Sequence, residues 1–190
     1  IIISSPSGNG KSTTLYSLLQ ELNQPERNIY LMEKNPEHKL DGVNQLPPSK
    51  NNWDKILQHD SDIVVLDDIE SNEDFKRVFQ AANSGRLVMA SITANSSWEV
   101  LLKILQLKLP LSLRLNNLKL IINQRTVKLK RNKDPKKVFR EEIGLFEALN
   151  LNQAMKDFIL NSKNDPQKKN FWETLARLAL ENNFQPLSKD

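Results

Sequence analysis

Cysteine is absent from this 190-residue sequence, which excludes disulfides, thiolate zinc sites and cysteine nucleophiles. The two histidines, His38 and His59, leave little scope for a histidine metal cluster or a Ser-His-Asp triad, and their polar surroundings favour surface positions. No apolar run approaches the roughly 20 residues that a membrane span needs. A net charge of +4 is too small to indicate a nucleic-acid partner by itself. With 38% hydrophobic and 26% charged residues, the chain is neither a membrane protein nor low-complexity disorder.

Glycine is also scarce, with 5 residues against the roughly 13 that average usage of about 7% would give. Two of the five, Gly8 and Gly10, lie within the segment Ser5-Pro6-Ser7-Gly8-Asn9-Gly10-Lys11-Ser12. This segment follows the apolar residues 1–3 and precedes a helix expected over about 11–22, which is the context of a phosphate-binding P-loop. Residues 1–3 carry neither Met nor a basic segment, so we expect a buried strand inside a longer protein rather than a signal peptide.

The P-loop pattern assigns a role to each of its residue types. Backbone N–H groups at a helix N-terminus form a nest for phosphate oxygens, and Gly10 lets the backbone approach them closely. Lys11 would reach the β- and γ-phosphates, and the Ser12 hydroxyl would ligate Mg²⁺. The alternative is a Ser/Gly-rich turn that merely precedes a helix. The predicted nucleotide-binding residues are Ser7, Gly8, Asn9, Gly10, Lys11, Ser12 and Thr13.

Two acids, Asp67 and Asp68, follow the continuous apolar run 63–66. In a RecA-type sheet, an acid at the carboxyl end of a buried strand lies beside the P-loop. One carboxylate would hold Mg²⁺ through water, and the other would orient or deprotonate the attacking water. In one assignment, Asp67 is the acid on the metal side with Ser12, and Asp68 is the base. The alternative is that these acids only cap the following turn and helix.

Apolar runs alternate with helical stretches, which predicts an α/β fold with a mostly parallel sheet flanked by helices. After residue 117 the pattern changes to strands at 118–123 and 126–130 joined by a tight turn, with one more strand at 143–146. From residue 152 the chain is predicted to be helical. We therefore expect a nucleotide-binding domain over 1–150 and a C-terminal helical tail over 151–190 that packs on it. The remaining predicted elements are strands at 28–32, 63–66 and 87–92 and helices at 72–83 and 98–106.

Beyond the P-loop, the sequence resembles the motor domain of the type II secretion and type IV pilus assembly ATPases over nearly its whole length. The run Ser12-Thr13-Thr14-Leu15-Tyr16 matches the family's run residue for residue. The other matching segments are Asn28-Ile29, Glu33 to Glu37, Gly42 to Gln45, Asp60 to Asp62, Ala81 to Val88, Gln124-Arg125 and Gly144 to Glu147.

The resemblance implies a RecA-like P-loop NTPase domain that uses ATP and Mg²⁺ to drive pilus or pseudopilus assembly. It adds Glu33, in the family's acidic box, to Asp67 and Asp68 as candidate catalytic residues. It further implies a hexameric ring, a cytoplasmic protein peripheral to the inner membrane, and partners among inner-membrane platform and cytoplasmic adaptor proteins, with no direct nucleic acid. The family supplies further arginines from an N-terminal domain that this chain lacks, so we expect the chain alone to bind nucleotide and hydrolyse it very slowly.

Several departures from the family pattern fall on the predicted chemistry. Lys34 replaces an aspartate and would place a cation near the γ-phosphate, Glu70 replaces an arginine, and Thr93 replaces a histidine. In the strand-end box, Gly-Glu becomes Asp67-Asp68, which shortens the catalytic carboxylate. Glycine is also replaced at the first P-loop position, by Ser5. These changes favour an alternative function: a catalytically impaired pseudo-ATPase that acts as a structural or regulatory subunit of the same machinery.

The family's cysteine-ligated metal insert is replaced by a short basic hairpin at Val127 to Lys137. This segment is either a solvated loop or a surface for an acidic partner or the inner membrane leaflet. The three tryptophans are predicted on helices, in core or subunit-interface packing. Arg125 either faces a neighbouring subunit's nucleotide or pairs with an acid.

Overall fold

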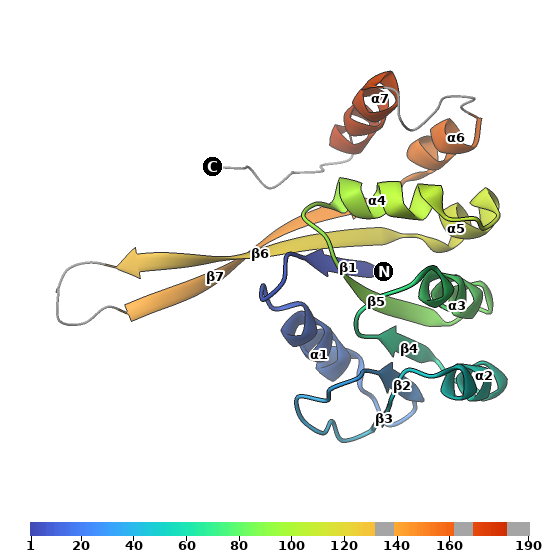
Figure 1. The fold of residues 1–190 in the computed structure, drawn as a ribbon, viewed down its shortest axis with the longest axis vertical. Coiled ribbons are helices and arrows are strands. Elements are labelled where there is room, and N and C mark those ends of the chain that lie inside the picture. The colour runs from blue at the N-terminus through green and yellow to red at the C-terminus, as the bar shows by residue number, and fades with distance from the viewer. Residues whose placement is uncertain (132–138, 162–168, 182–190) are drawn as a thin grey trace.

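The computed structural model describes residues 1–131, 139–161 and 169–181, which form one seven-stranded sheet with helices on both faces (Figure 1). The strand order is β3-β2-β4-β5-β1-β6-β7, and all pairings are parallel except that of β6 with β7. The strands are β1 Ile2–Ser5, β2 Ile29–Met32, β3 Val43–Leu46, β4 Ile63–Leu66, β5 Leu87–Thr93, β6 Leu120–Arg131 and β7 Phe139–Asn150.

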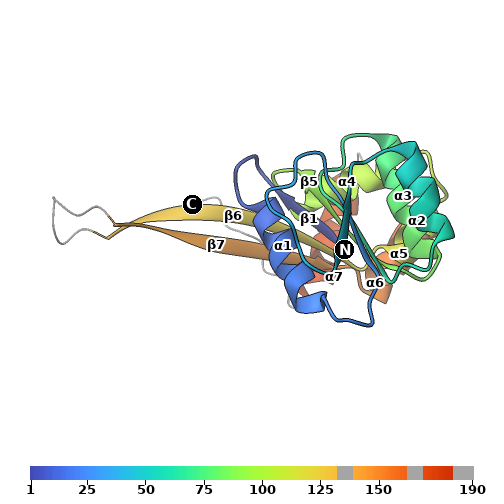
Figure 2. The same ribbon diagram turned by 90° about the horizontal axis from the view of Figure 1, so that it is seen from below.

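Helix α1 covers one face of the sheet, and α2 to α5 cover the other (Figure 2). Side chains alternate between the faces of a strand, so Ile3 packs with α1 whereas Ile2 packs with the opposite helices. Val65 and Val64 of β4 divide in the same way. The helices are α1 Lys11–Leu22, α2 Lys50–Gln58, α3 Asn72–Asn83, α4 Ser97–Gln106, α5 Leu111–Asn117, α6 Gln153–Asn161 and α7 Lys169–Leu180.

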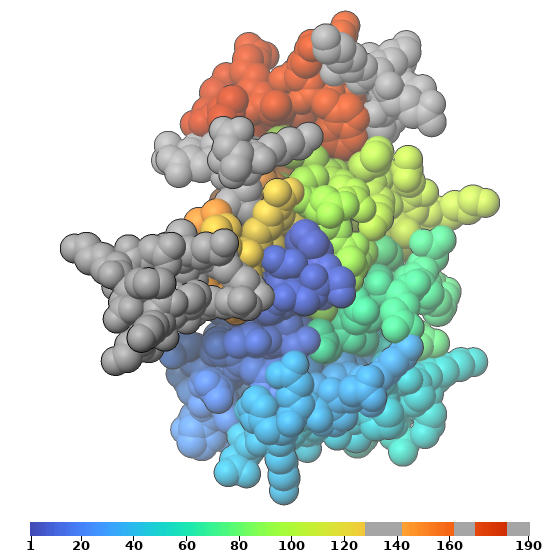
Figure 3. All heavy atoms as spheres, turned by 60° about the vertical axis from the view of Figure 1, so that its left-hand side comes forward, coloured from blue at the N-terminus to red at the C-terminus, as the bar shows by residue number. Residues whose placement is uncertain are grey.

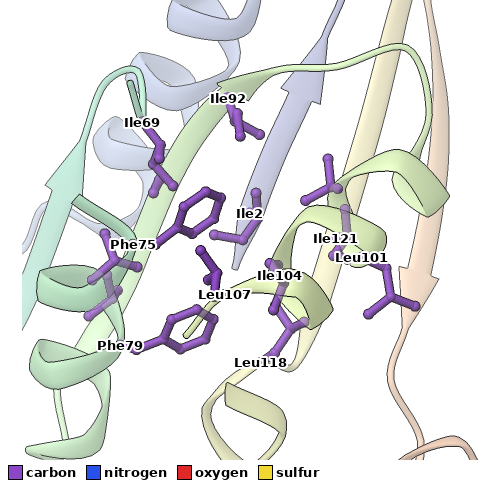
Figure 4. Packing of buried hydrophobic residues seen from close by; sticks show 14 of the residues in the cluster. Ile2, Ile69, Phe75, Phe79, Ile92, Leu101, Ile104, Leu107, Leu118 and Ile121 are labelled. Atoms are coloured by element: carbon purple, nitrogen blue, oxygen red, sulfur yellow. The ribbon is translucent and has the colours of Figure 1, made fainter. Parts of the chain in front are cut away.

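The larger apolar core lies on the face opposite α1, where Phe75, Phe79 and Ile104 meet the strands (Figure 4). Helices α6 and α7 contribute to this same cluster through Met155 and Phe171. The tail helices therefore share one continuous core with the sheet. Within the described part of the chain, no helix has the length and apolar character of a membrane span.

The predicted fold class is confirmed, and two helices have the expected bounds. Both α1 and α3 begin and end where the sequence pattern placed them, and Ser71 caps α3 in a capping box with Asp74. Gly85 lies just beyond this helix with φ +88°, a backbone conformation that favours glycine.

The predicted tight turn between residues 123 and 126 is wrong. Strand β6 runs without interruption through this segment, because Gln124 and Arg125 pair with Phe146 and Leu145 of β7. The two strands extend as a hairpin beyond the body of the domain (Figures 1 and 2). Residues 132–137 of the basic segment lie outside the described residues, so the predicted role of this segment remains a prediction.

Two elements, β3 and α5, were not predicted, and the helix expected around Trp53, α2, had no predicted bounds. Strand β3 is a half-exposed edge strand with a polar centre, so it lacks the apolar run that marks a buried parallel strand. Helix α2 is mostly polar and buries only Trp53 and Ile56, but Ser49 caps it by accepting a hydrogen bond from Asn52 N. Helix α5 is only 7 residues long.

Candidate functional site

The loop between β1 and α1 has the backbone of a phosphate nest. Gly8 and Gly10 adopt φ values of +74° and +78°, which side-chain-bearing residues rarely adopt. Gly10 directly precedes α1, so the free N–H groups of the first helical turn face the loop. Glu37 and the loop line a cavity of about 240 Å³ together with Ser5 and Thr13. This cavity is bordered by six of the seven residues predicted to bind nucleotide.

Ser5 occupies the first P-loop position without strain. It is the last residue of β1 and pairs with Thr93 of β5. Among the described residues, Asp68 is the one non-glycine residue with positive φ, so Ser5 has ordinary extended backbone. Glycine is therefore not required at this position, and the departure from the family pattern leaves the loop intact.

Asp67 lies between the P-loop and the neighbouring strand β5. Its Oδ2 accepts a hydrogen bond of 3.0 Å from Ser12 Oγ, and its Oδ1 accepts one of 2.7 Å from Ser91 Oγ. A serine hydroxyl and an aspartate oxygen in contact form the donor set that P-loop proteins use for Mg²⁺. The residues present therefore fit the predicted metal site. Ser91 was missed by the sequence analysis because nothing in a buried strand distinguishes a serine that orients a carboxylate.

Asp68 adopts the left-handed conformation with φ +69°, held by a 2.8 Å hydrogen bond from its N–H to Ser91 Oγ. In the described part of the chain, its carboxylate makes no hydrogen bond or ion pair. Burial raises the pKa of this carboxyl above its usual value, with Asp67 and Glu70 adding to the shift, although the nearby Lys11 opposes it. Asp68 lines a cleft of about 630 Å³ at the ends of β4 and β5.

Lys11 donates a 2.6 Å hydrogen bond from Nζ to Thr93 Oγ1. Thr93 ends β5, which lies beside β1, so the parallel pairing brings these residues together although they are 82 positions apart. Thr93, which replaces the family's histidine, thus contacts the P-loop lysine, Lys11.

Lys34 and Glu70 form an ion pair with each other at the rim of the site. Both are departures from the family pattern, and their charges are opposite to those of the aspartate and arginine that they replace. The hydrogen bond to Glu70 raises the pKa of Lys34. The sequence predicted a cation near the γ-phosphate, and the structure pairs this cation with Glu70.

Glu33 is buried, and its carboxylate accepts hydrogen bonds from Tyr16 Oη at 2.6 Å and Gln45 Nε2 at 2.8 Å. Burial and this hydrogen bond raise the pKa of Tyr16 to about 12. The structure therefore brings Ser12, Lys11 and the two aspartates together, whereas Glu33 is engaged with α1 and β3.

The other residues noted in the sequence have more ordinary surroundings. Trp53 is fully buried, and Trp98 and Trp172 meet edge to face at 5.9 Å, so the predicted packing of the tryptophans is confirmed. Both histidines are exposed, as predicted. Arg125 donates a hydrogen bond from Nη2 to the Asn95 carbonyl.

The fold and the loop between β1 and α1 define the class of the protein, a P-loop domain with a RecA-like architecture. Residues 1–170 match the family described as Type II/IV secretion system protein, and the chain belongs to this family. It is similar to the "Type II secretion system ATPase E" of Vibrio cholerae, with 36% identity over 104 residues that cover 51% of this chain and 21% of the relative. It is also similar to the "Protein transport protein HofB homolog" of Haemophilus influenzae, with 30% identity over 169 residues that cover 80% and 36%. The chain thus spans about a fifth to a third of the length of these relatives.

Solved structures support the fold. The ATPase DotB of Legionella pneumophila superposes with a TM-score of 0.77 at 19% identity, over 97% of this chain and 52% of DotB. The pilus retraction motor PilT, solved with bound ADP, superposes with a TM-score of 0.69 at 20% identity, over 96% and 53%. At these identities the likeness concerns the fold alone.

Proposed function

We propose that this chain is the ATP-binding motor domain of a type II secretion or type IV pilus assembly ATPase, which couples ATP binding and hydrolysis to the assembly of a pilus or pseudopilus. The observation that carries the proposal is the contact of Ser12 with Asp67 beside the loop of Gly8 and Gly10. The proposal is also supported by the family to which the chain belongs and by a relative of the chain that is named as an ATPase.

The proposed site divides into binding and catalytic parts. Residues 7–13 bind the phosphates, and Ser12 and Asp67 hold Mg²⁺, which when bound supplies charge neutralisation at the phosphates. Asp68 is the proposed base, because its carboxylate is free of hydrogen bonds in the described part of the chain and its raised pKa favours proton acceptance. Glu33 belongs to the proposed catalytic set, but it must exchange its hydrogen bonds to Tyr16 and Gln45 in order to act there.

The proposal extends to organisation and partners. We propose residues 1–150 as the nucleotide-binding domain and 151–190 as a tail that packs on it. The full-length protein would form a ring, with six subunits as the expected number. It would work in the cytoplasm at the inner membrane, through platform and adaptor proteins and without direct contact with nucleic acid.

Two measurements test this function. The first is binding of a fluorescent ADP analogue with Mg²⁺, which the wild-type chain should show and Lys11→Ala should lose. The second is steady-state ATP turnover by the full-length protein, compared with Lys11→Ala, Asp67→Ala and Asp68→Ala. Turnover lost in Lys11→Ala and in an aspartate variant supports the motor. Nucleotide binding with turnover no higher than that of Lys11→Ala supports the pseudo-ATPase instead.

A further inference from the structure

Residues of the P-loop form hydrogen bonds with the edge of strand β6. Strand β1 pairs with β6 only as far as Ser4 opposite Asn123. Beyond this point the loop continues the pairing, because Thr126 N donates a 2.9 Å hydrogen bond to Asn9 Oδ1. Asn9 therefore replaces β1 as the partner of this edge of β6. In the space-filling view the first residues of the chain, in blue, lie against the strand in yellow (Figure 3).

Gln124 fixes the same loop from within β6. Gln124 is buried, with 5% of the residue exposed, and both the nitrogen and the oxygen of its side-chain amide form hydrogen bonds. Nε2 donates a hydrogen bond to the backbone carbonyl of Asn9, and Oε1 accepts one of 2.7 Å from Thr14 Oγ1 in α1. One side chain thus joins the loop to the first turn of the helix that follows it.

The bond to the Asn9 carbonyl determines where the next N–H group points. The carbonyl of Asn9 and the N–H of Gly10 belong to one planar trans peptide, in which the two groups point in opposite directions. When the carbonyl is held toward Gln124, the N–H of Gly10 must point away from β6. The fit is close, since a Cβ on Gly10 would lie 3.2 Å from Gln124 Nε2.

We infer that Gln124 is a positioning residue that presets the P-loop for phosphate before the nucleotide arrives. The inference rests on the proposed function and deepens it, because the site then depends on a residue 115 positions away from the loop. Presetting a binding group raises affinity, since the ordering is completed before the ligand binds. Strand β6 is suited to this task because β7 pairs with it along its whole length.

The experiment compares Gln124→Leu and Gln124→Glu with the matched control Gln80→Leu, whose parent side chain is exposed on α3. Gln124→Glu keeps the size and the acceptor for Thr14 but replaces the donor to Asn9 with a carboxylate oxygen. Two properties of the full chain are measured: the Kd for a fluorescent ADP analogue with Mg²⁺, and amide hydrogen exchange of residues 7–14 without ligand. Exchange of β4 reports on global unfolding.

Both Gln124 variants should bind the analogue about tenfold more weakly and exchange faster at residues 7–14, with β4 and the control unchanged. A merely structural role would instead accelerate exchange in β4 as well, and that result would overturn the inference. Wild-type behaviour of Gln124→Glu in both measurements would also overturn it. If the wild-type chain does not bind the analogue, the proposed function fails, whereas exchange in the ligand-free protein still decides the role of Gln124.

Discussion

Replacing Tyr16 with phenylalanine should destabilise the protein even though the aromatic ring remains in place. The hydroxyl of Tyr16 donates a hydrogen bond of 2.6 Å to Glu33 Oε2, and the two residues are only 4% and 3% exposed. A hydrogen bond to a charged group contributes about 1.5–3 kcal/mol, and a buried carboxylate that loses a donor cannot turn to water instead. Because the ring remains, no cavity term is added. We expect a loss of about 2 kcal/mol in the free energy of unfolding.

The assay is denaturant unfolding at neutral pH, with Tyr30→Phe as the matched control. Tyr30 is half-buried, and its hydroxyl makes no hydrogen bond within the described residues. The loss for Tyr16→Phe corresponds to a fall in Tm of about 4–8 °C for a chain of this size, and the control should change little.

The pH dependence of the same loss follows from the pKa of Tyr16. In the folded protein this pKa is raised to about 12, so the stabilisation is complete below the unfolded value near 10 and is lost between pH 10 and 12. A loss below about 0.5 kcal/mol at neutral pH, or equal losses in both tyrosine variants, would refute the view that this hydroxyl holds Glu33.

Three further outcomes are expected. Glu99→Gln should lower stability at pH 7, and this loss should shrink as the pH falls through the folded pKa of Glu99, which the hydrogen bonds from Asn95 and Lys103 hold below its usual value. Thermal unfolding across pH checks this, with Glu21→Gln as control, and a pH-independent loss would contradict it. Lys34→Glu should weaken nucleotide binding, because it places a second carboxylate beside Glu70, and the double variant Lys34→Glu/Glu70→Lys should restore binding. If the nucleotide affinity does not recover in the double variant, the ion pair does not matter to the site. Phe171→Ala should lower the free energy of unfolding by about 3–5 kcal/mol in a single cooperative transition, because α7 shares the main core, whereas the exposed Leu180 on the same helix should tolerate Leu180→Ala. A separate, earlier unfolding transition of the tail helices would contradict this.

Prediction from the sequence succeeded where neighbours along the chain carry the signal. The P-loop is one contiguous segment, and α3 has a capping serine and a glycine beyond its end, so both could be located by inspection. Prediction failed at β6, where the pairing partner that keeps the strand straight lies in β7. It also failed at β3, an edge strand whose half-exposed surface has no distinctive pattern.

The sequence by itself determined the class of site, because a phosphate loop and an acidic strand end are local patterns whose residue types define the chemistry. It also displayed the departures at Lys34, Glu70 and Thr93, but as separate changes with no known contacts. Only the tertiary structure decided which residues they contact. The order of the parallel strands brings their carboxyl ends together, so Lys34 meets Glu70, and Thr93 meets Lys11. The same packing places Gln124 against Asn9, a contact between residues 115 positions apart that no pattern along the chain records.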